Sequence, residues 1–207
     1  MADESTFRIF LTILFATFIF IWLRNFLSVG ISRDALYTPT EGLLVAVPLR
    51  LLLVASVVGM VVYVVNPARM AWSTILLPLW LRWLGFPVGL CAIFLVHWVL
   101  KSLGQNFSTS LTIKEKQTLV THGPYRRVRH PMYTAFILLW VAFLLLSANW
   151  FIGFTGIMAF VWTTVIRTPK EEEMMSDRFG EEYIAYKQRT GRYLPRRLMR
   201  NDPDARL

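Results

Sequence analysis

The sequence predicts an all-α integral membrane protein: one compact bundle of about five transmembrane helices that ends in a short C-terminal helical hairpin. Hydrophobic residues make up 55% of the 207-residue chain, whereas a soluble domain is nearer about 45–50% apolar. Several apolar runs approach the roughly 20 residues that a helix needs to cross a bilayer. The basic residues gather between alternate runs, as they do in multi-pass membrane proteins.

Three spans are predicted in the first part of the chain, over residues 7–23, 43–65 and 84–100. Asp3 and Glu4 stand before the first run in place of a basic leader, and no A-x-A-like cleavage site follows it. We therefore interpret this run as a transmembrane helix rather than a secretory signal. Segment 71–83 is rich in tryptophan and contains Arg82, a composition typical of the headgroup level.

The last two spans are predicted over residues 132–147 and 150–166, which form the hairpin 132–166. A helix of 16 residues rises only about 24 Å, less than the roughly 30 Å of the hydrocarbon core. We expect a tight hairpin whose open end meets local thinning of the bilayer or a protein-lined recess.

The charge pattern predicts the orientation of the chain. The formal net charge is +9, and of the 22 lysines and arginines only Arg8, Arg50, Arg69 and Arg82 lie outside the loops on one side and the C-terminal tail. This bias predicts an N-terminus outside and a cytoplasmic C-terminus. It also explains the positive charge without a nucleic-acid partner. Cys91 is the single cysteine, so no internal disulfide is possible.

A cytoplasmic amphipathic helix is predicted after the fifth span. Thr168 and Glu171, with Pro169 between them, have the form of a capping box with proline at the first helical position. Gly191 is a plausible C-cap. An apolar stripe at spacings of four, four and three residues connects Met175, Phe179, Tyr183 and Tyr186.

Two polar clusters are candidates for function. The stretch "HGPYRRVRHPMY", residues 122–133, interleaves backbone-shaping residues with aromatics, as a pocket wall does. Arg167 precedes three glutamates, Glu171 to Glu173. These charges either complement a helix end or form a functional group at the mouth of the hairpin. No metal site, P-loop or nucleophile motif is recognisable, and the role of Arg50 inside the second span stays open.

The two clusters together resemble the isoprenylcysteine carboxyl methyltransferase family, part of a wider group of membrane methyltransferases that includes phospholipid methyltransferases. The resemblance rests on "QTLVTHGPYRRVRHPMY", the apolar hairpin and "IRTPKEEEMMSDRFGEEYIAYKQRTGRYLP". It covers residues 101–196, and the first two spans match only in character. It implies a division into transmembrane helices over residues 1–100 and a catalytic region over residues 101–207.

The resemblance implies that S-adenosyl-L-methionine binds in a cytosolic cofactor pocket without a Rossmann domain. The implied cofactor contacts are Gln117, Thr118, Leu119, Val120, Tyr125, His130, Pro131, Met132, Tyr133 and Glu171. Arg167 would face the substrate, because a guanidinium suits a carboxylate, and Arg167 and Glu171 would form the catalytic pair. If the capping box forms, Glu172 takes the place of Glu171, and both remain candidates.

The function implied is methyl transfer to a membrane-embedded acceptor, with the carboxylate of an isoprenylcysteine on a small molecule or a protein as the expected substrate. A phospholipid or another small lipid is the alternative acceptor. Two other classes stay open: a sterol-reductase-like oxidoreductase and a non-catalytic protein that binds membrane lipids through its basic loop.

Overall fold

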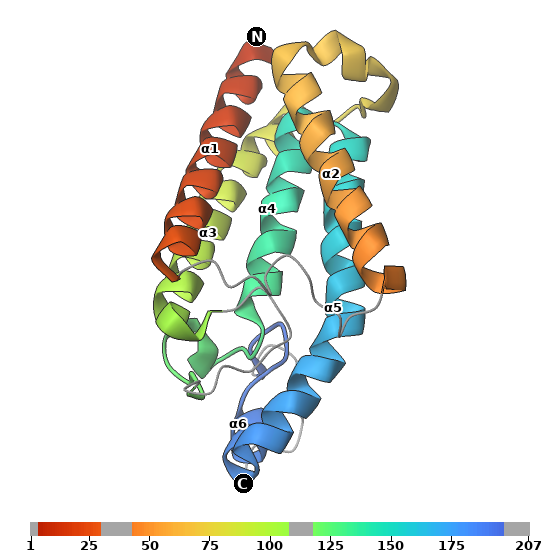
Figure 1. Ribbon diagram of the computed structural model, residues 1–207. Coiled ribbons are helices and arrows are strands. Elements are labelled where there is room, and N and C mark those ends of the chain that lie inside the picture. The colour runs from red at the N-terminus through yellow and green to blue at the C-terminus, as the bar shows by residue number, and fades with distance from the viewer. Residues whose placement is uncertain (1–3, 30–42, 108–117, 197–207) are drawn as a thin grey trace, which may run out of the picture.

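The computed structural model describes residues 4–29, 43–107 and 118–196. Gln117, one of the predicted cofactor contacts, lies outside the described residues. The helices are α1 Glu4–Val29, α2 Leu43–Val65, α3 Leu79–Leu103, α4 Pro131–Ser147, α5 Trp150–Phe179 and α6 Glu181–Arg189 (Figure 1). Short 3-10 helices are η2 Pro67–Ser73, η3 Gly104–Asn106 and η4 Gly123–Arg126. The described residues contain isolated β-bridges but no strand, which confirms the all-α prediction.

The predicted spans correspond to α1 to α5. Four helices are long and apolar enough to cross a membrane, and α4 is the shorter apolar helix that the sequence predicted. Helix α3 begins at Leu79, so the last part of the segment predicted to be interfacial is already helical. The first part forms η2 at the end of the bundle that carries the N-terminus (Figure 1). We call this the N-terminal end and the end that carries α6 the pocket end.

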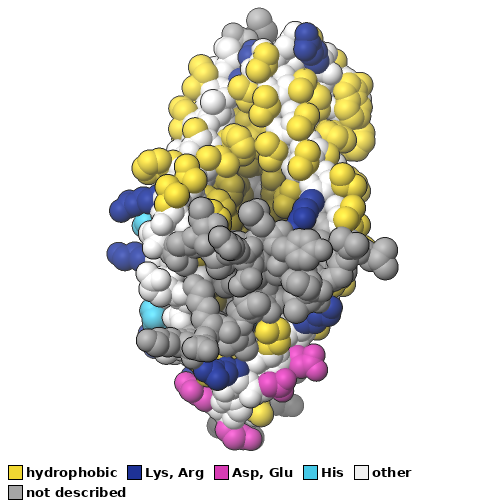
Figure 2. All heavy atoms as spheres, in the orientation of Figure 1, with side chains coloured by type: hydrophobic (Ala, Val, Ile, Leu, Met, Phe, Trp, Pro, Cys, Tyr) yellow, Lys and Arg dark blue, Asp and Glu magenta, His cyan; other side chains and the backbone are white. Residues whose placement is uncertain are grey.

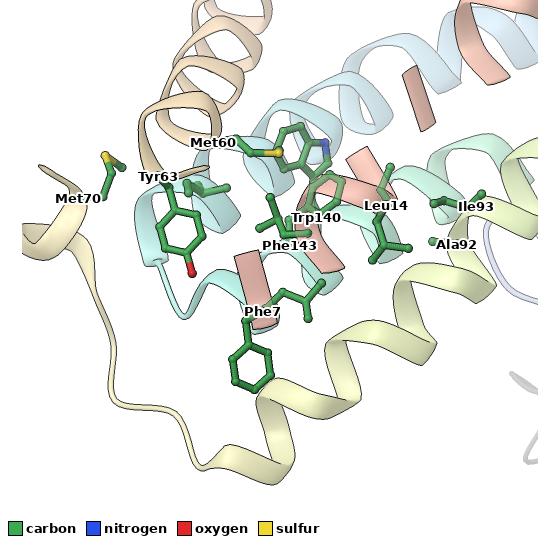
Figure 3. Packing of buried hydrophobic residues seen from close by; sticks show 13 residues of the cluster. Phe7, Leu14, Met60, Tyr63, Met70, Ala92, Ile93, Trp140 and Phe143 are labelled. Atoms are coloured by element: carbon green, nitrogen blue, oxygen red, sulfur yellow. The ribbon is translucent and has the colours of Figure 1, made fainter. Parts of the chain in front are cut away.

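Helix α4 lies between α1, α3 and α5 and carries much of the buried core. Trp140 and Phe143 point from α4 into the same apolar cluster as Leu14 of α1 and Met60 of α2 (Figure 3). Glycine allows the close contact of α4 with α5: a Cβ at Gly156 would lie 2.1 Å from the Trp140 ring. Small residues at helix contacts are typical of membrane bundles.

Polar side chains join the helices at the N-terminal end. The carboxylate of Glu4 accepts bonds of 2.8 and 3.0 Å from Arg82 and a further bond from Tyr63. Arg82 also donates to the Leu146 carbonyl at 2.7 Å. At the hairpin tip, the buried Asn149 caps α5 by accepting from Ile152 N–H at 3.2 Å. Only Ala148 and Asn149 separate α4 from α5, which confirms the predicted tight hairpin.

The predicted capping box at Thr168 is wrong. Helix α5 continues through Pro169 to Phe179, and the Thr168 hydroxyl is buried with no hydrogen-bond partner among the described residues. Proline removes one backbone donor, but the tertiary packing of α5 holds the helix on both sides of it.

The helix predicted after the fifth span is divided, because Gly180 (φ 51°) ends α5 and α6 begins directly after it. Gly191 follows the C-cap residue Thr190 but does not have the positive φ of a glycine cap, so that prediction is wrong. Gly191 instead forms a parallel bridge with Val128, where a Cβ would lie 1.8 Å from the Leu194 carbonyl oxygen.

Candidate active site at the open end of the hairpin

One cavity of about 570 Å³ runs from the apolar interior of the bundle to the pocket end. Its apolar part is lined by α1, α2 and α4, with Phe15, Val57 and Phe143 among the lining residues. Its outer part is lined by α5, α6 and the segment before α4. Figure 2 shows hydrophobic side chains over the spans and charged side chains gathered at the pocket end. The cavity therefore joins an apolar compartment to a polar one.

Glu171 lies at the centre of the polar compartment. Its carboxylate accepts a 2.9 Å hydrogen bond from the Tyr133 hydroxyl and lies 3.6 Å from Arg167 Nε. His130 Nδ1 lies 3.5 Å from its other oxygen. Because α5 is continuous, Arg167 and Glu171 are one turn apart on one face, contrary to the arrangement that the capping box implied.

Glu172 has a different environment. Its side chain is only 3% exposed, and it pairs with Arg129 Nε at 3.0 Å and with Arg192 at 2.7 Å. Lys187 Nζ and His130 Nε2 lie 3.4 Å from its two oxygens. Glu172 does not line the cavity, whereas Glu171 does. Of the two carboxylates that the sequence left open, Glu171 is the one positioned to contact a ligand.

The segment before α4 is held by the C-terminal residues. Arg129 N–H donates to Gly191 O and His130 N–H to Arg192 O, both at 2.9 Å. Gly191 N–H donates in turn to Arg127 O at 3.1 Å. These backbone bonds orient His130 at the start of α4, where Pro131 occupies the first helical turn.

Most of the predicted site residues come together. The cavity is lined by Thr118, Leu119, Val120, Tyr125, His130, Met132, Tyr133, Arg167 and Glu171. Pro131 is buried at the start of α4 and is not among the lining residues. Arg50 is exposed on α2 and also lies outside the lining.

The lining residues at the pocket end include Arg129, Tyr183 and Tyr186, which were not predicted as site residues. The two tyrosines belong to the apolar stripe recognised in the sequence. The helical spacing of that stripe was the feature that could have predicted their inward orientation. Burial raises the pKa of Tyr125, and burial also raises the pKa of Tyr186 to about 12. Both phenols are therefore neutral at physiological pH and offer aromatic surface and hydrogen bonds.

These features define a class: a multi-helix membrane protein with an intramembrane apolar cavity that ends in a compartment of paired charges. Within that class, residues 83–177 match the model of the isoprenylcysteine carboxyl methyltransferase (ICMT) family. The matched region is just under half of the 207-residue chain.

Curated relatives and a solved structure resemble the chain. It is 28% identical over 141 residues to the methanethiol S-methyltransferase of a Pseudomonas species, covering 61% of this chain and 53% of that protein. It is 29% identical over 121 residues to a probable protein-S-isoprenylcysteine O-methyltransferase of Oryza sativa (55% and 62%). It is 32% identical over 95 residues to protein-S-isoprenylcysteine O-methyltransferase B of Arabidopsis thaliana (44% and 48%).

The solved structure of the eukaryotic intramembrane Ras methyltransferase ICMT superposes with a TM-score of 0.53 at 25% identity. The superposition covers 70% of this chain and 51% of that one. The chain thus spans about half to three fifths of the length of the proteins that it resembles.

Proposed function

We propose that this protein is an S-adenosylmethionine-dependent methyltransferase that methylates the carboxylate of an S-isoprenylcysteine. The observation that carries the proposal is the continuity of the cavity from the apolar compartment to Arg167 and Glu171. A lipid tail fits the first compartment, and a polar methyl donor and an anionic acceptor group fit the second. The family match over residues 83–177 supports the same reaction class.

The residues at the pocket end fit S-adenosylmethionine. Tyr125 and Tyr133 offer aromatic faces, which bind a planar base or a cationic sulfonium. The Glu171 carboxylate suits the ammonium group of the methionyl part. His130 also lines the cavity, between Glu171 at 3.5 Å from its Nδ1 and Glu172 at 3.4 Å from its Nε2. When bound, this cofactor supplies an electrophilic methyl group.

Arg167 is the proposed acceptor-binding residue. It lines the cavity with a side chain that is 15% exposed, and its guanidinium can hold a carboxylate through two parallel hydrogen bonds. A carboxylate is already ionised at neutral pH, so the protein needs no general base. Its remaining tasks are to align the acceptor oxygen with the methyl group and to exclude water.

The apolar compartment is the proposed site for the isoprenoid tail. Phe18, Leu53 and Phe136 line it from three different helices. Ile19 of α1 and Val57 of α2 line the cavity and are 43% and 38% exposed. A membrane-embedded tail can therefore reach the compartment sideways, between α1 and α2.

Other acceptors fit this geometry less well. A small thiol, the acceptor in the name of the Pseudomonas relative, needs neither a long apolar compartment nor a cation. An aminophospholipid presents a cationic amine, which favours an acceptor-side carboxylate over Arg167. A non-catalytic lipid-binding protein has no need of the paired charges around Glu171.

A radiolabelled methyl-transfer assay with the full chain in detergent tests the proposal. We expect incorporation from S-adenosylmethionine into N-acetyl-S-farnesylcysteine and its geranylgeranyl analogue, released as methanol by base because the product is an ester. The matched control is the same analogue already methylated at its carboxyl group, which should accept nothing. Incorporation only into methanethiol or into phosphatidylethanolamine would assign the protein to one of the alternative acceptors.

A further inference from the structure

We propose that Glu172 is a positioning residue that fastens the C-terminal segment 181–193 onto the pocket end, and that Tyr183 and Tyr186 form the wall that binds the purine nucleoside part of the cofactor. The inference rests on the proposed function and extends it to segment 181–193, which lies beyond the family match over residues 83–177.

The first step is the convergence of cations on Glu172. Arg129 comes from the segment before α4, Lys187 from α6 and Arg192 from the residues after α6, and all three lie within 3.4 Å of its carboxylate. The buried Glu172 carboxylate therefore connects α5 with the segment before α4, with α6 and with the residues after α6. Removing its charge leaves the buried Arg129, whose side chain is 8% exposed, beside two further cations without the carboxylate that neutralises it.

The second step is that the ion pairs around Glu172 support the wall of the cavity. Arg129 also donates to the carbonyls of Lys187, at 3.1 Å, and Thr190. Tyr186 donates from its hydroxyl to the Tyr125 carbonyl at 2.7 Å. Segment 181–193 therefore touches the predicted cofactor loop through both side chains and backbone, and Glu172 neutralises the charges that this contact brings together.

The third step is the chemistry of the wall. Tyr183 and Tyr186 are 2% and 3% exposed and line the cavity together with Tyr125. The centroids of the Tyr183 and Tyr186 rings are 6.0 Å apart. Neutral aromatic side chains in the wall of a polar compartment give a planar base apolar and edge contacts. Glu171 and Arg167 lie on α5, line the same cavity and are the proposed contacts of the charged groups.

Binding measurements with S-adenosylhomocysteine, which carries no transferable methyl group, test the positioning role. By calorimetry on the full chain in detergent, Glu172→Gln should weaken binding at least tenfold, whereas Glu172→Asp should restore part of the affinity. The matched control is Glu173→Gln, the exposed neighbour, which should change affinity less than twofold. The KM for the prenylated acceptor should stay within twofold of wild type in Glu172→Gln, because the apolar compartment does not depend on segment 181–193.

Trypsin accessibility gives a readout that is independent of the cofactor. Cleavage after Lys187, Arg189 and Arg192 should be faster in Glu172→Gln than in Glu173→Gln. If Glu172→Gln and Glu173→Gln are cleaved at the same rate and bind S-adenosylhomocysteine equally well, the positioning role is overturned. If Glu172→Gln loses acceptor binding together with cofactor binding, Glu172 contributes only to the stability of the whole protein. If wild type itself does not bind S-adenosylhomocysteine, the proposed function fails instead.

The aromatic wall is tested with methylthioadenosine, a purine nucleoside probe that lacks the methionyl group. Tyr186→Leu keeps side-chain bulk without a ring and should weaken this probe at least fivefold. Tyr186→Phe keeps the ring and should bind within about threefold of wild type. Equal affinities for Tyr186→Leu and Tyr186→Phe would contradict the assignment of the wall.

Discussion

The Tyr133 hydroxyl donates a 2.9 Å hydrogen bond to the Glu171 carboxylate, and this bond joins the first turn of α4 to α5 at the polar compartment. The ring of Tyr133 is also stacked near His130, with centroids 5.9 Å apart. The orientation of Glu171 therefore depends on a neighbouring helix as well as on its own. A carboxylate fixed in this way is prepared for a cationic ligand before the ligand arrives.

Tyr133→Phe should weaken S-adenosylhomocysteine binding at least about tenfold, because one hydrogen bond to a charged group contributes roughly 1.5–3 kcal/mol. Calorimetry in detergent measures the change. The control is Tyr193→Phe, whose hydroxyl donates to the Thr164 carbonyl at 3.2 Å and does not line the cavity. If both variants bind like wild type, Tyr133 does not orient Glu171 for the cofactor.

Arg167→Met should lower kcat/KM for an S-farnesylcysteine analogue at least about 100-fold, the loss expected when roughly 3 kcal/mol of charge-assisted hydrogen bonding is removed. Arg167→Lys should recover part of the activity, since an ammonium keeps the charge but not the planar fork. Steady-state kinetics separates the two variants.

The control for Arg167 is Lys170→Met, an exposed cation on the same helix, which should retain activity. The affinity of Arg167→Met for S-adenosylhomocysteine should stay within about threefold of wild type, because the acceptor and not the cofactor is the proposed partner. Unchanged turnover in Arg167→Met would remove Arg167 from the acceptor site.

The helical spans could be predicted from the sequence because each follows from a local property, the length of an apolar run. The break at Thr168 was predicted from an equally local pattern, and it failed. The capping residues there are inside a helix that tertiary contacts hold together, and Thr168 is buried rather than placed at a free helix end. Local propensity loses to packing at such positions.

The site was predictable only in part. The short motif around His130 and the spacing of Arg167 and Glu171 pointed to residues that line one cavity. The pairing of Arg129 with Glu172 connects residues 43 positions apart, and that of Arg192 with Glu172 requires the turn after α6. No local pattern encodes contacts that form only after the C-terminal segment has folded back.

Gly156→Ala should destabilise the bundle by about 1–3 kcal/mol, the usual cost of overpacking a buried contact. A Cβ there would lie 2.1 Å from the Trp140 ring, and that ring also lines the cavity. Thermal unfolding in a mild detergent measures the loss. Gly59→Ala is the control, because its Cβ would meet Phe151 at 3.2 Å, a contact that a small side-chain shift relieves. If Gly156→Ala is as stable as Gly59→Ala, α4 and α5 are packed less tightly than the 2.1 Å approach to Trp140 implies.

The orientation of the bundle can be tested with two single-cysteine proteins in which Cys91 is replaced by alanine. Arg189 is exposed on α6 at the pocket end, and Arg69 is exposed on η2 at the N-terminal end. Because basic residues are retained on the cytoplasmic side, we expect a membrane-impermeant maleimide to label Arg69→Cys in intact cells. It should label Arg189→Cys only in inverted or opened membranes. Each protein is the control for the other, and the reverse labelling pattern would place the pocket end on the outer side, away from the cytosol.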